Sequence, residues 1–318
     1  MKIAIVILNW NGKNDTLECL RSLTQMTYSG KWEVILVDNG SQDGSVSAFR
    51  REFPQAAIIE TGENLGFAAG NNVGIKKALN QGADAVVMLN NDTVVSPTFL
   101  ESLAKMALQY PNALLGCKIH QYHHPEYLDH LGGVWNPSKA NFDLIGKNAP
   151  AGEKYNTSFD MDYACGCGLF IPKSVFAAIG YLEPSYFLYW EDSDFCYRAK
   201  KAGFPIKFCP EATIWHKGSA SSENKKYLPT YFWWRNRMLW MRRNLSKKER
   251  KYLYRKAVYP EIRHLCKLLF LKSLSWHLYL KYNKKSSHYA RRFMQLMQYK
   301  AAAKGCIDYA RKKFGSMS

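Results

Sequence analysis

The sequence lacks the patterns that mark secreted and membrane-spanning proteins. Its eight cysteines form no C-x-x-C pair and several lie in apolar runs, so we expect them to be reduced and packed as small apolar residues in a cytoplasmic protein. No run of about 18 apolar residues occurs, which predicts that no segment spans a membrane. The apolar run 3–8 is too short for a signal peptide and no cleavage site follows it, so it is interpreted as a first strand.

Two nucleotide-binding fingerprints are also missing. The pattern G-x-G-x-x-G does not follow the first predicted strand, and G-x-x-x-x-G-K-[ST] occurs nowhere. These absences disfavour a dinucleotide-dependent dehydrogenase and a P-loop enzyme.

Acidic residues are scarce in one part of the chain. Residues 245–318 contain 19 Lys and Arg but only 3 Asp and Glu, a balance of +16, whereas the other residues contain 25 against 23, a balance of +2. Nearly all of the net charge of +18 therefore belongs to the C-terminal part. We expect a nearly neutral domain over residues 1–244, with halves at 1–110 and 111–244, and a basic helical extension over residues 245–318.

Predicted strands and helices alternate over the first half of that domain. Strands are predicted at 3–8, 33–37, 57–60 and 85–89, with helices at 13–26, 44–53, 69–80 and after Pro97. Alternation with helices of 10–15 residues is typical of βαβ units, in which helices cover both faces of a parallel sheet. The predicted fold class is therefore α/β.

Polar residues end each of these four strands. They are Asn9 and Asn11, then Asp38, then Asn64 and Gly66, then Asn90, Asn91 and Asp92. The carboxyl ends of parallel strands share one edge of a sheet, where ligands bind. We therefore expect a site there, with a hard cation at Asp92 and the imide N–H of a uracil or thymine at Asp38. The alternative is that these residues only form turns and helix caps, as Asp38 would with Ser41.

Three acidic residues, Glu191, Asp192 and Asp194, open a predicted helix directly after the aromatic run 186–190. Acids are common at helix N-termini, which is the structural alternative for this group. Aromatic side chains exclude water, however, and a carboxylate in a partly dry pocket has its pKa raised toward the working range of a general base. Glu191 and Asp192 are therefore candidate catalytic residues.

His216 ends another predicted strand, after an unassigned stretch at 112–160 that is rich in Gly, Pro, Asn and His. It is either an ordinary surface histidine or a neutral imidazole bound to the same cation as Asp92.

Six motifs together resemble the family-2 glycosyltransferases with the GT-A fold, of the rhamnosyltransferase-like branch. They are ILNWNG (7–12), VDNGSQDGS (37–45), NLGFAAGNNVGI (64–75), LNND (89–92), WEDSDFCYR (190–198) and HKGS (216–219). Each motif is weak alone, but the six occur in the order of the family and span roughly residues 1–245. The basic extension has no counterpart in this resemblance.

The resemblance implies a nucleotide-sugar donor, a base-binding role for Asp38, and a metal-binding D-x-D element at residues 90–92. The donor-site residues that it implies are Asn9, Asn11, Asp38, Asn64, Gly66, Asn71, Asn90 and Asn91. It places the general base of an inverting transfer in the pair Glu191 and Asp192, with Asp192 preferred. The first Asp of D-x-D is Asn90 here. A single carboxylate holds Mg²⁺ or Mn²⁺ less strongly, so we expect the metal to enter mostly with the diphosphate.

The predicted function is thus an inverting, metal-dependent glycosyltransferase of cell-envelope polysaccharide synthesis. Its donor would be a UDP- or dTDP-sugar, with dTDP-rhamnose one candidate, and its acceptor a glycan or a lipid-linked sugar. One alternative is a nucleic-acid-binding protein that uses the basic extension, although this leaves the polar strand ends unexplained. The other is a nucleotidylyltransferase, which should have a glycine-rich basic loop after the first strand, where only Lys13 is found.

The predicted helices in and just before the basic extension allow two interpretations, packing against protein or contact with a membrane. Helices are predicted at 227–244 and 261–281. On the second, Ile262, Leu265, Leu269, Trp276 and Leu280 share one face, and Arg263, His264, Lys267 and Lys281 lie toward the other. These helices either pack on the catalytic domain or on a second subunit of a homodimer, or lie on an anionic membrane surface. The second alternative predicts a peripheral protein at the inner face of the plasma membrane, with no nucleic-acid partner.

Overall fold

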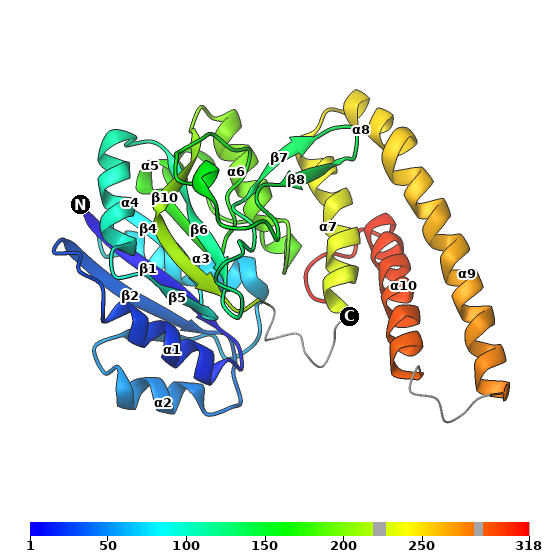
Figure 1. Ribbon diagram of the computed structural model, residues 1–318, viewed down its shortest axis with the longest axis horizontal. Coiled ribbons are helices and arrows are strands. Elements are labelled where there is room, and N and C mark those ends of the chain that lie inside the picture. The colour runs from blue at the N-terminus through cyan, green and yellow to red at the C-terminus, as the bar shows by residue number, and fades with distance from the viewer. Residues whose placement is uncertain (219–226, 283–288, 318) are drawn as a thin grey trace. The chain divides into compact units, whose positions relative to one another are not determined.

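The structure, a computed structural model, describes the helices and strands of residues 1–218, 227–282 and 289–317, and the side chains of the same residues except 275–290 and 292 (Figure 1). Ser219, Trp276, Leu280 and Lys281 of the motifs and faces predicted above therefore lie outside the described side chains. The chain divides into two compact units. The first comprises Met1–Val134, Asp143–Phe187 and Glu191–Ser221, and the second comprises Trp135–Phe142, Leu188–Trp190 and Ser222–Ser318.

The first unit begins with the predicted alternation of strands and helices. Its elements run β1 (Lys2–Asn9), α1 (Lys13–Leu23), β2 (Lys31–Asp38), α2 (Ser45–Glu52), β3 (Ala57–Glu60), α3 (Gly66–Asn80) and β4 (Ala85–Asn90). They continue with β5 (Thr93–Val95), α4 (Phe99–Gln109), β6 (Leu114–Gln121), β9 (Gly168–Pro172), α5 (Lys173–Ile179), α6 (Glu191–Lys201) and β10 (Ile206–His216). The hairpin of β7 (Gly133–Asn136) and β8 (Asn141–Leu144) belongs partly to each unit.

In the described residues the large sheet has eight strands in the order β3-β2-β1-β4-β9-β6-β10-β5. The pairs β3/β2, β2/β1, β1/β4 and β6/β10 are parallel, whereas β9 runs antiparallel to β4 and β6, and β5 antiparallel to β10. The prediction of an α/β fold with a mostly parallel sheet is confirmed. Parallel register places the ends of β1, β2 and β4 side by side, with Asn9 opposite Asp38 and Leu8 opposite Asn90.

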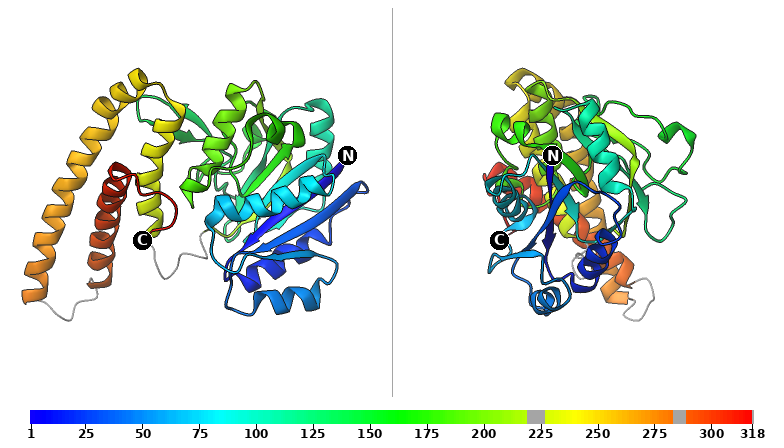
Figure 2. Two further views of the ribbon diagram at one scale, coloured as in Figure 1. Left: turned by 180° about the vertical axis from the view of Figure 1, so that it is seen from behind. Right: turned by 90° about the vertical axis from the view of Figure 1, so that its left-hand side faces the viewer.

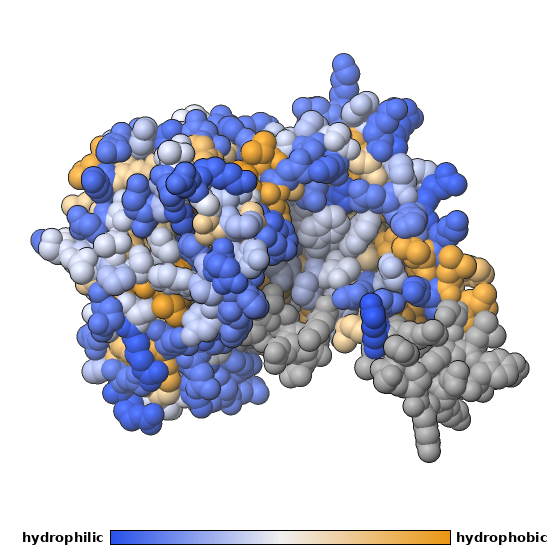
Figure 3. All heavy atoms as spheres, viewed as in Figure 1, coloured by the Kyte–Doolittle hydropathy of each residue, from blue (hydrophilic) through white to orange (hydrophobic). Residues whose placement is uncertain are grey.

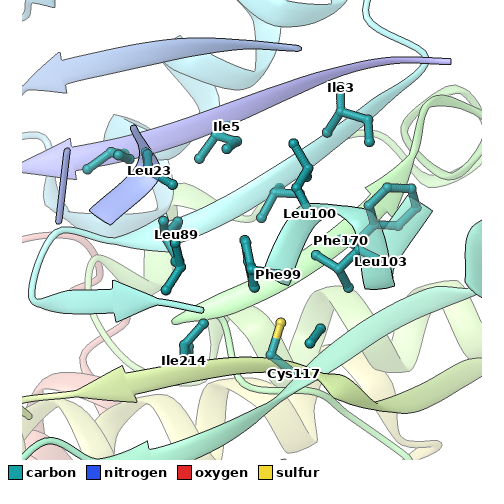
Figure 4. Packing of buried hydrophobic residues seen from close by; sticks show 14 of the residues in the cluster. Ile3, Ile5, Leu23, Leu89, Phe99, Leu100, Leu103, Cys117, Phe170 and Ile214 are labelled. Atoms are coloured by element: carbon teal, nitrogen blue, oxygen red, sulfur yellow. The ribbon is translucent and has the colours of Figure 1, made fainter. Parts of the chain in front are cut away.

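Helices cover both faces of this sheet because every second residue of a central strand points to the same side. Ile3, Ile5 and Ile7 of β1 share a buried cluster with residues of α1, α2 and α4, part of which Figure 4 shows. Val6 and Leu8 of the same strand point to α3, which lies on the face seen from behind in Figure 2. Each fully buried Ile or Leu side chain contributes roughly 1.5–3 kcal/mol to folding.

The second unit is mainly helical. It contains α7 (Leu228–Asn244), α8 (Lys247–Leu253), α9 (Tyr259–Tyr282) and α10 (Tyr289–Ala310), with a short π-helical turn at Tyr254–Val258. Trp240 of α7 is fully buried, with its ring centroid 4.4 Å from that of Trp135 and 5.3 Å from that of Phe142. No helix among the described residues is long and apolar enough to cross a membrane. The boundary drawn from charge at residue 244 stays a prediction, and by internal packing α7 groups with the basic helices.

Candidate active site

The ends of β1 and β2 are joined by side-chain hydrogen bonds. Nδ2 of Asn9 donates to Oδ1 of Asp38 at 2.8 Å and to Oγ of Ser41 at 3.0 Å. The N–H of Ser41 donates to Oδ2 of Asp38 at 2.9 Å, so Asp38 does form the turn cap named as an alternative above. The cap leaves each carboxylate oxygen of Asp38 with a further lone pair for a ligand. Asn11 continues this network, because its Oδ1 accepts a bond from the N–H of Gln42 at 2.7 Å.

The loop before α3 is fixed by a second amide network. Asn39 donates from Nδ2 to Oδ1 of Asn64 at 3.0 Å, and Oδ1 of Asn64 also accepts from the N–H of Gly66 at 2.8 Å. Gly66 has φ of +82°, and a Cβ there would lie 2.5 Å from the ring of Phe187. Only glycine fits this position, since both the backbone conformation and the close aromatic neighbour exclude a side chain. Asn71, one turn into α3, is buried and donates to the carbonyl of Phe67 within its own helix.

The turn after β4 holds the predicted metal-binding residues in different environments. Asn91 is turned toward β1 and α1, because its Nδ2 donates to Oγ1 of Thr16 at 2.9 Å and to Oδ1 of Asn9 at 3.3 Å. Asn90 and Asp92 instead approach His216, with Nδ2 of Asn90 3.5 Å and Oδ1 of Asp92 3.3 Å from Nε2 of the imidazole. The antiparallel pairing of β10 with β5, in which His216 lies opposite Thr93, produces this approach.

The other nitrogen of His216 is bound by Asp129. Nδ1 of His216 lies 2.8 Å from Oδ2 of Asp129, and Oδ1 of Asp129 lies 3.4 Å from Nδ1 of His130. Burial lowers the pKa of His216, but its bonds to Asp129 and Asp92 outweigh burial and raise that pKa to about 10. Without a metal the imidazole is therefore protonated and donates to both carboxylates. A cation that takes Nε2 must displace that proton, so metal binding releases a proton here.

These residues fit a divalent cation that brings ligands of its own. Oδ1 of Asp92 and Nε2 of His216 converge from the turn between β4 and β5 and from the end of β10, and a carboxylate that holds the far nitrogen of a histidine is the usual support of a metal ligand. No group of three or more His, Cys, Asp or Glu that could hold a metal is found among the described residues. Two protein ligands suit Mg²⁺ or Mn²⁺ bound together with phosphate oxygens.

The two acids that begin α6, Glu191 and Asp192, differ in burial and in hydrogen bonding. Asp192 is half-buried, and its oxygens accept from the N–H groups of Gly166 at 3.1 Å and Ser193 at 2.7 Å. Glu191 is buried, and its Oε2 has no hydrogen-bond partner among the described residues. Burial raises the pKa of Asp192 to about 6, and burial followed by the charge of Asp192 raises the pKa of Glu191 well above its usual value. At neutral pH Asp192 is therefore mostly ionised, and Glu191 holds its proton more tightly than an exposed glutamate does.

The third acid, Asp194, has a structural role. It is fully buried, accepts from Nε of Arg198 at 2.8 Å on Oδ2, and accepts from the hydroxyl of Tyr186 at 3.0 Å on Oδ1. Both oxygens of Asp194 thus hold other parts of the first unit in place.

The segment 165–167, just before β9, links the acidic pair to the strand ends. The N–H of Gly166 binds Asp192, and the carbonyl of Cys167 accepts from the N–H of Asn90 at 3.0 Å. The structure therefore brings Asp192 near the edge that carries Asn9, Asp38 and Asn90. Asp129 and Gly166 were missed by the sequence analysis, because they lie between the motifs and have no periodic neighbours.

Comparison with known families agrees with this geometry. The chain matches the family model described as Glycosyl transferase family 2 over residues 4–175. It is 28% identical over 246 residues to the low-salt glycan biosynthesis hexosyltransferase Agl10 of Haloferax volcanii, covering 74% of each chain. It is 26% identical over 248 residues to the N-acetylglucosaminyl-diphospho-decaprenol L-rhamnosyltransferase of Mycobacterium tuberculosis, covering 65% of this chain and 78% of the relative.

Solved structures share the fold. The mannosyltransferase PcManGT from Pyrobaculum calidifontis, in complex with GDP-Man and Mn²⁺, superposes with a TM-score of 0.58 and 13% identity. The match covers 98% of this chain and 87% of that one. The prediction of a GT-A fold and the resemblance to the rhamnosyltransferase-like branch are confirmed by these matches.

Proposed function

The chain belongs to glycosyl transferase family 2, and from this premise we propose that it is an inverting, metal-dependent hexosyltransferase of cell-envelope polysaccharide synthesis. Its donor is a nucleotide-diphosphate sugar and its acceptor a glycan or a lipid-linked sugar. The observation that carries the proposal is the placement of Asp192, a half-buried carboxylate with a raised pKa that accepts from the N–H of Gly166, beside the segment 165–167 whose Cys167 carbonyl is bonded to Asn90 at the end of β4. Family membership supports this function over the nucleic-acid-binding and nucleotidylyltransferase alternatives.

The chemistry is a single in-line displacement at the anomeric carbon of the donor. Asp192 takes the proton of the acceptor hydroxyl as the new bond from oxygen to the anomeric carbon forms. The old bond to the phosphate oxygen breaks, and its electron pair leaves with the nucleoside diphosphate, so the anomeric configuration inverts. Glu191, whose pKa burial raises well above its usual value, is the next candidate for the base.

The metal belongs to the leaving-group side of the reaction. When bound, a divalent cation supplies positive charge that stabilises the departing diphosphate. Asp92 and His216 are its proposed ligands, with Mg²⁺ and Mn²⁺ both acceptable to an oxygen-rich site of this kind. The Mn²⁺ in the PcManGT complex supports this assignment by analogy of fold only.

The donor base is proposed to bind at Asp38. A carboxylate with a free lone pair accepts the imide N–H of uracil or thymine, but not a cytosine N3, which carries no proton. The L-rhamnosyltransferase relative makes a dTDP-rhamnose donor our first choice and a UDP-sugar the second. Asn9, Asn11, Asn64, Gly66, Asn71, Asn90 and Asn91 are proposed to shape the rest of the donor site.

Ligand-dependent stabilisation tests the donor. A nucleotide that binds only the folded protein raises the melting temperature, so dTDP- and UDP-sugars are expected to raise it when Mn²⁺ is present, and CDP-sugars are not. The anomeric configuration of the product, read by NMR, then tests the mechanism. A product that keeps the donor configuration, or stabilisation by CDP-sugars alone, would reject the proposal.

The acceptor is proposed to be carried on lipid at the cytoplasmic face of the membrane. The mycobacterial relative is named for a diphospho-decaprenol acceptor, and the excess of Lys and Arg in residues 245–318 suits an anionic lipid surface. The protein would then be peripheral, with the basic helices of the second unit on the membrane.

A further inference from the structure

One face of α9 is exposed along its described length. Tyr259, Arg263, Lys267, Phe270, Leu271 and Leu274 recur at intervals of three and four residues, which places them on the same side of a helix. The large apolar members are 60% (Tyr259), 68% (Phe270), 47% (Leu271) and 51% (Leu274) exposed. We call these six residues the α9 face.

The other side of α9 is turned into the second unit. Leu265 is 5% exposed, and Ile262 and Leu269 are half-buried. These three residues belong to the apolar face that the sequence predicts, whose other members, Trp276 and Leu280, lie outside the described side chains. Phe270, Leu271 and Leu274 face outward instead. Figure 3 shows hydrophobic residues gathered on the surface over α9. Among its described side chains, 259–274, the helix therefore has apolar residues on two sides, and those of the inner side are the packed ones.

The charges of the α9 face select its partner. Arg263 and Lys267 are exposed and lie along the helix between Tyr259 and the apolar group of Phe270, Leu271 and Leu274. No acidic residue belongs to the face, because the nearest acid of α9, Glu261, is ion-paired with the buried guanidinium of Arg237. A helix with exposed apolar and aromatic residues beside cations and no acids matches the composition of helices that lie in the headgroup region of anionic bilayers.

A second copy of the chain fits this face poorly. In a two-fold symmetric interface both subunits contribute the same surface. Such an interface would bring two arginines and two lysines together with no carboxylate of the face to pair with them. Like charges in an interface oppose association. An anionic lipid surface instead offers phosphates to the cations and acyl chains to the apolar residues.

We infer that the α9 face is a membrane-insertion surface, with Phe270, Leu271 and Leu274 below the lipid headgroups and Arg263 and Lys267 on the phosphates. The inference deepens the proposed membrane location and rests on it. The described part of the face, from Tyr259 to Leu274, is about 22 Å long at 1.5 Å per residue, which suits a helix that lies in the membrane plane. Interfacial helices place their apolar side about 5–10 Å into the bilayer.

Flotation of the full-length protein with vesicles tests the inference. We expect binding to vesicles of equal parts phosphatidylcholine and phosphatidylglycerol, weaker binding to phosphatidylcholine alone, and loss of binding as salt is added. Phe270→Ser with Leu274→Ser should weaken binding to the mixed vesicles about 10-fold or more, since two large side chains no longer leave water. Arg263→Gln with Lys267→Gln should weaken it by about five-fold for each cation. Leu108→Ser is the matched control, because Leu108 is 77% exposed on α4 of the first unit.

Cys266 supplies a direct probe of insertion. It is exposed and borders the α9 face, whereas the other seven cysteines are buried or half-buried. The emission maximum of an environment-sensitive fluorophore on Cys266 should shift to shorter wavelength when mixed vesicles are added. The same label on the Phe270→Ser, Leu274→Ser variant should show no such shift.

Three results would overturn the inference. They are unchanged binding of the Phe270→Ser, Leu274→Ser variant, no binding of the unaltered protein, and a dimer in lipid-free solution that this variant dissociates. Transfer to a water-soluble acceptor should be the same in all variants, since none alters the catalytic site. Absence of that transfer in the unaltered protein would reject the proposed function, while the flotation result would still decide the role of the face.

Discussion

Nδ1 of His216 lies 2.8 Å from Oδ2 of Asp129, so the far side of the imidazole is held while Nε2 points toward Oδ1 of Asp92. A carboxylate in this position orients a histidine ligand and makes it a stronger donor to a metal. Asp129 would therefore act as a positioning residue for the proposed metal ligand His216.

Asp129→Asn is expected to weaken Mn²⁺ binding about 10–100-fold, because loss of such a support typically has that effect. Binding is measured by the electron paramagnetic resonance of free Mn²⁺ in the presence of the nucleoside diphosphate, which needs no turnover. Asp160→Asn is the control, since Asp160 is an exposed carboxylate paired with Lys207. Affinity should also rise with pH up to about 10, the pKa of His216, because the metal displaces its proton. Equal Mn²⁺ affinity in both variants would remove Asp129 from this role.

Asp92 is expected to bind the diphosphate through the metal. Asp92→Ala should weaken binding of the nucleoside diphosphate far more than binding of the free nucleoside, since only the diphosphate shares the cation. EDTA should stop turnover and remove the same difference. Isothermal titration calorimetry with the nucleoside diphosphate and with the free nucleoside measures the difference in affinity. His216→Ala serves as a second variant. Full activity in EDTA would mean that positively charged side chains stabilise the leaving group instead.

Asp192→Asn should abolish transfer while donor binding survives. General base catalysis typically contributes 10²–10⁴-fold to the rate, so kcat is expected to fall by about that factor with little change in the KM of the donor. Glu191→Gln should be much milder, because burial raises the pKa of Glu191 well above its usual value and so favours the protonated form that Gln imitates. If the two variants behave the other way round, Glu191 is the base.

The pKa of Asp192 also predicts two pH effects. Transfer requires the ionised carboxylate, so kcat should fall as the pH drops through about 6. The folded state raises this pKa from 3.8 and thus binds the proton more tightly than the unfolded state does. Ionised Asp192 therefore destabilises the fold above pH 6 and has no such effect below about pH 4. Asp192→Asn should accordingly be the more stable protein at pH 8, by at most about 3 kcal/mol for two pKa units, with the difference vanishing at low pH. Urea unfolding at both pH values measures this.

How far the sequence predicts the site depends on how local each interaction is. Asn9, Asp38 and Asn90 were predicted together because the ends of neighbouring parallel strands must share an edge. Asp129 could not be found, because it lies in a stretch without periodicity and its partner His216 is 87 residues away. Burial is the main cause that raises the pKa of both Glu191 and Asp192, and one of the N–H groups that oppose it at Asp192 comes from Gly166, 26 residues away. A local sequence pattern shows that two acids begin a helix. It does not show which of them accepts a hydrogen bond from a backbone N–H distant in the sequence.

The last prediction concerns the residues directly before α6. Phe187, Tyr189 and Trp190 all have positive φ, of 63°, 66° and 76°, which costs about 1–3 kcal/mol for each such residue and must be offset by specific contacts. Asn236, fully buried on α7, supplies one, because its Nδ2 donates at 2.8 Å to the carbonyls of both Leu188 and Tyr189.

Asn236→Asp keeps the size of the side chain but turns this donor into an acceptor that faces two carbonyls. We expect the free energy of unfolding to fall by about 3 kcal/mol or more, since buried polar groups lose their partners and a charge is added. Asn244→Asp is the matched control on the same helix, because Nδ2 of Asn244 donates to the carbonyl of Trp240, one turn earlier in that helix. Asn244→Asp should lower the free energy of unfolding by less in the same urea titration. Hydrogen exchange of the peptide that contains residues 187–190 should rise in Asn236→Asp and not in Asn244→Asp, because Nδ2 of Asn236 donates to two carbonyls of that segment. Equal losses of stability with unchanged exchange in both variants would show that the strained segment is held by other contacts.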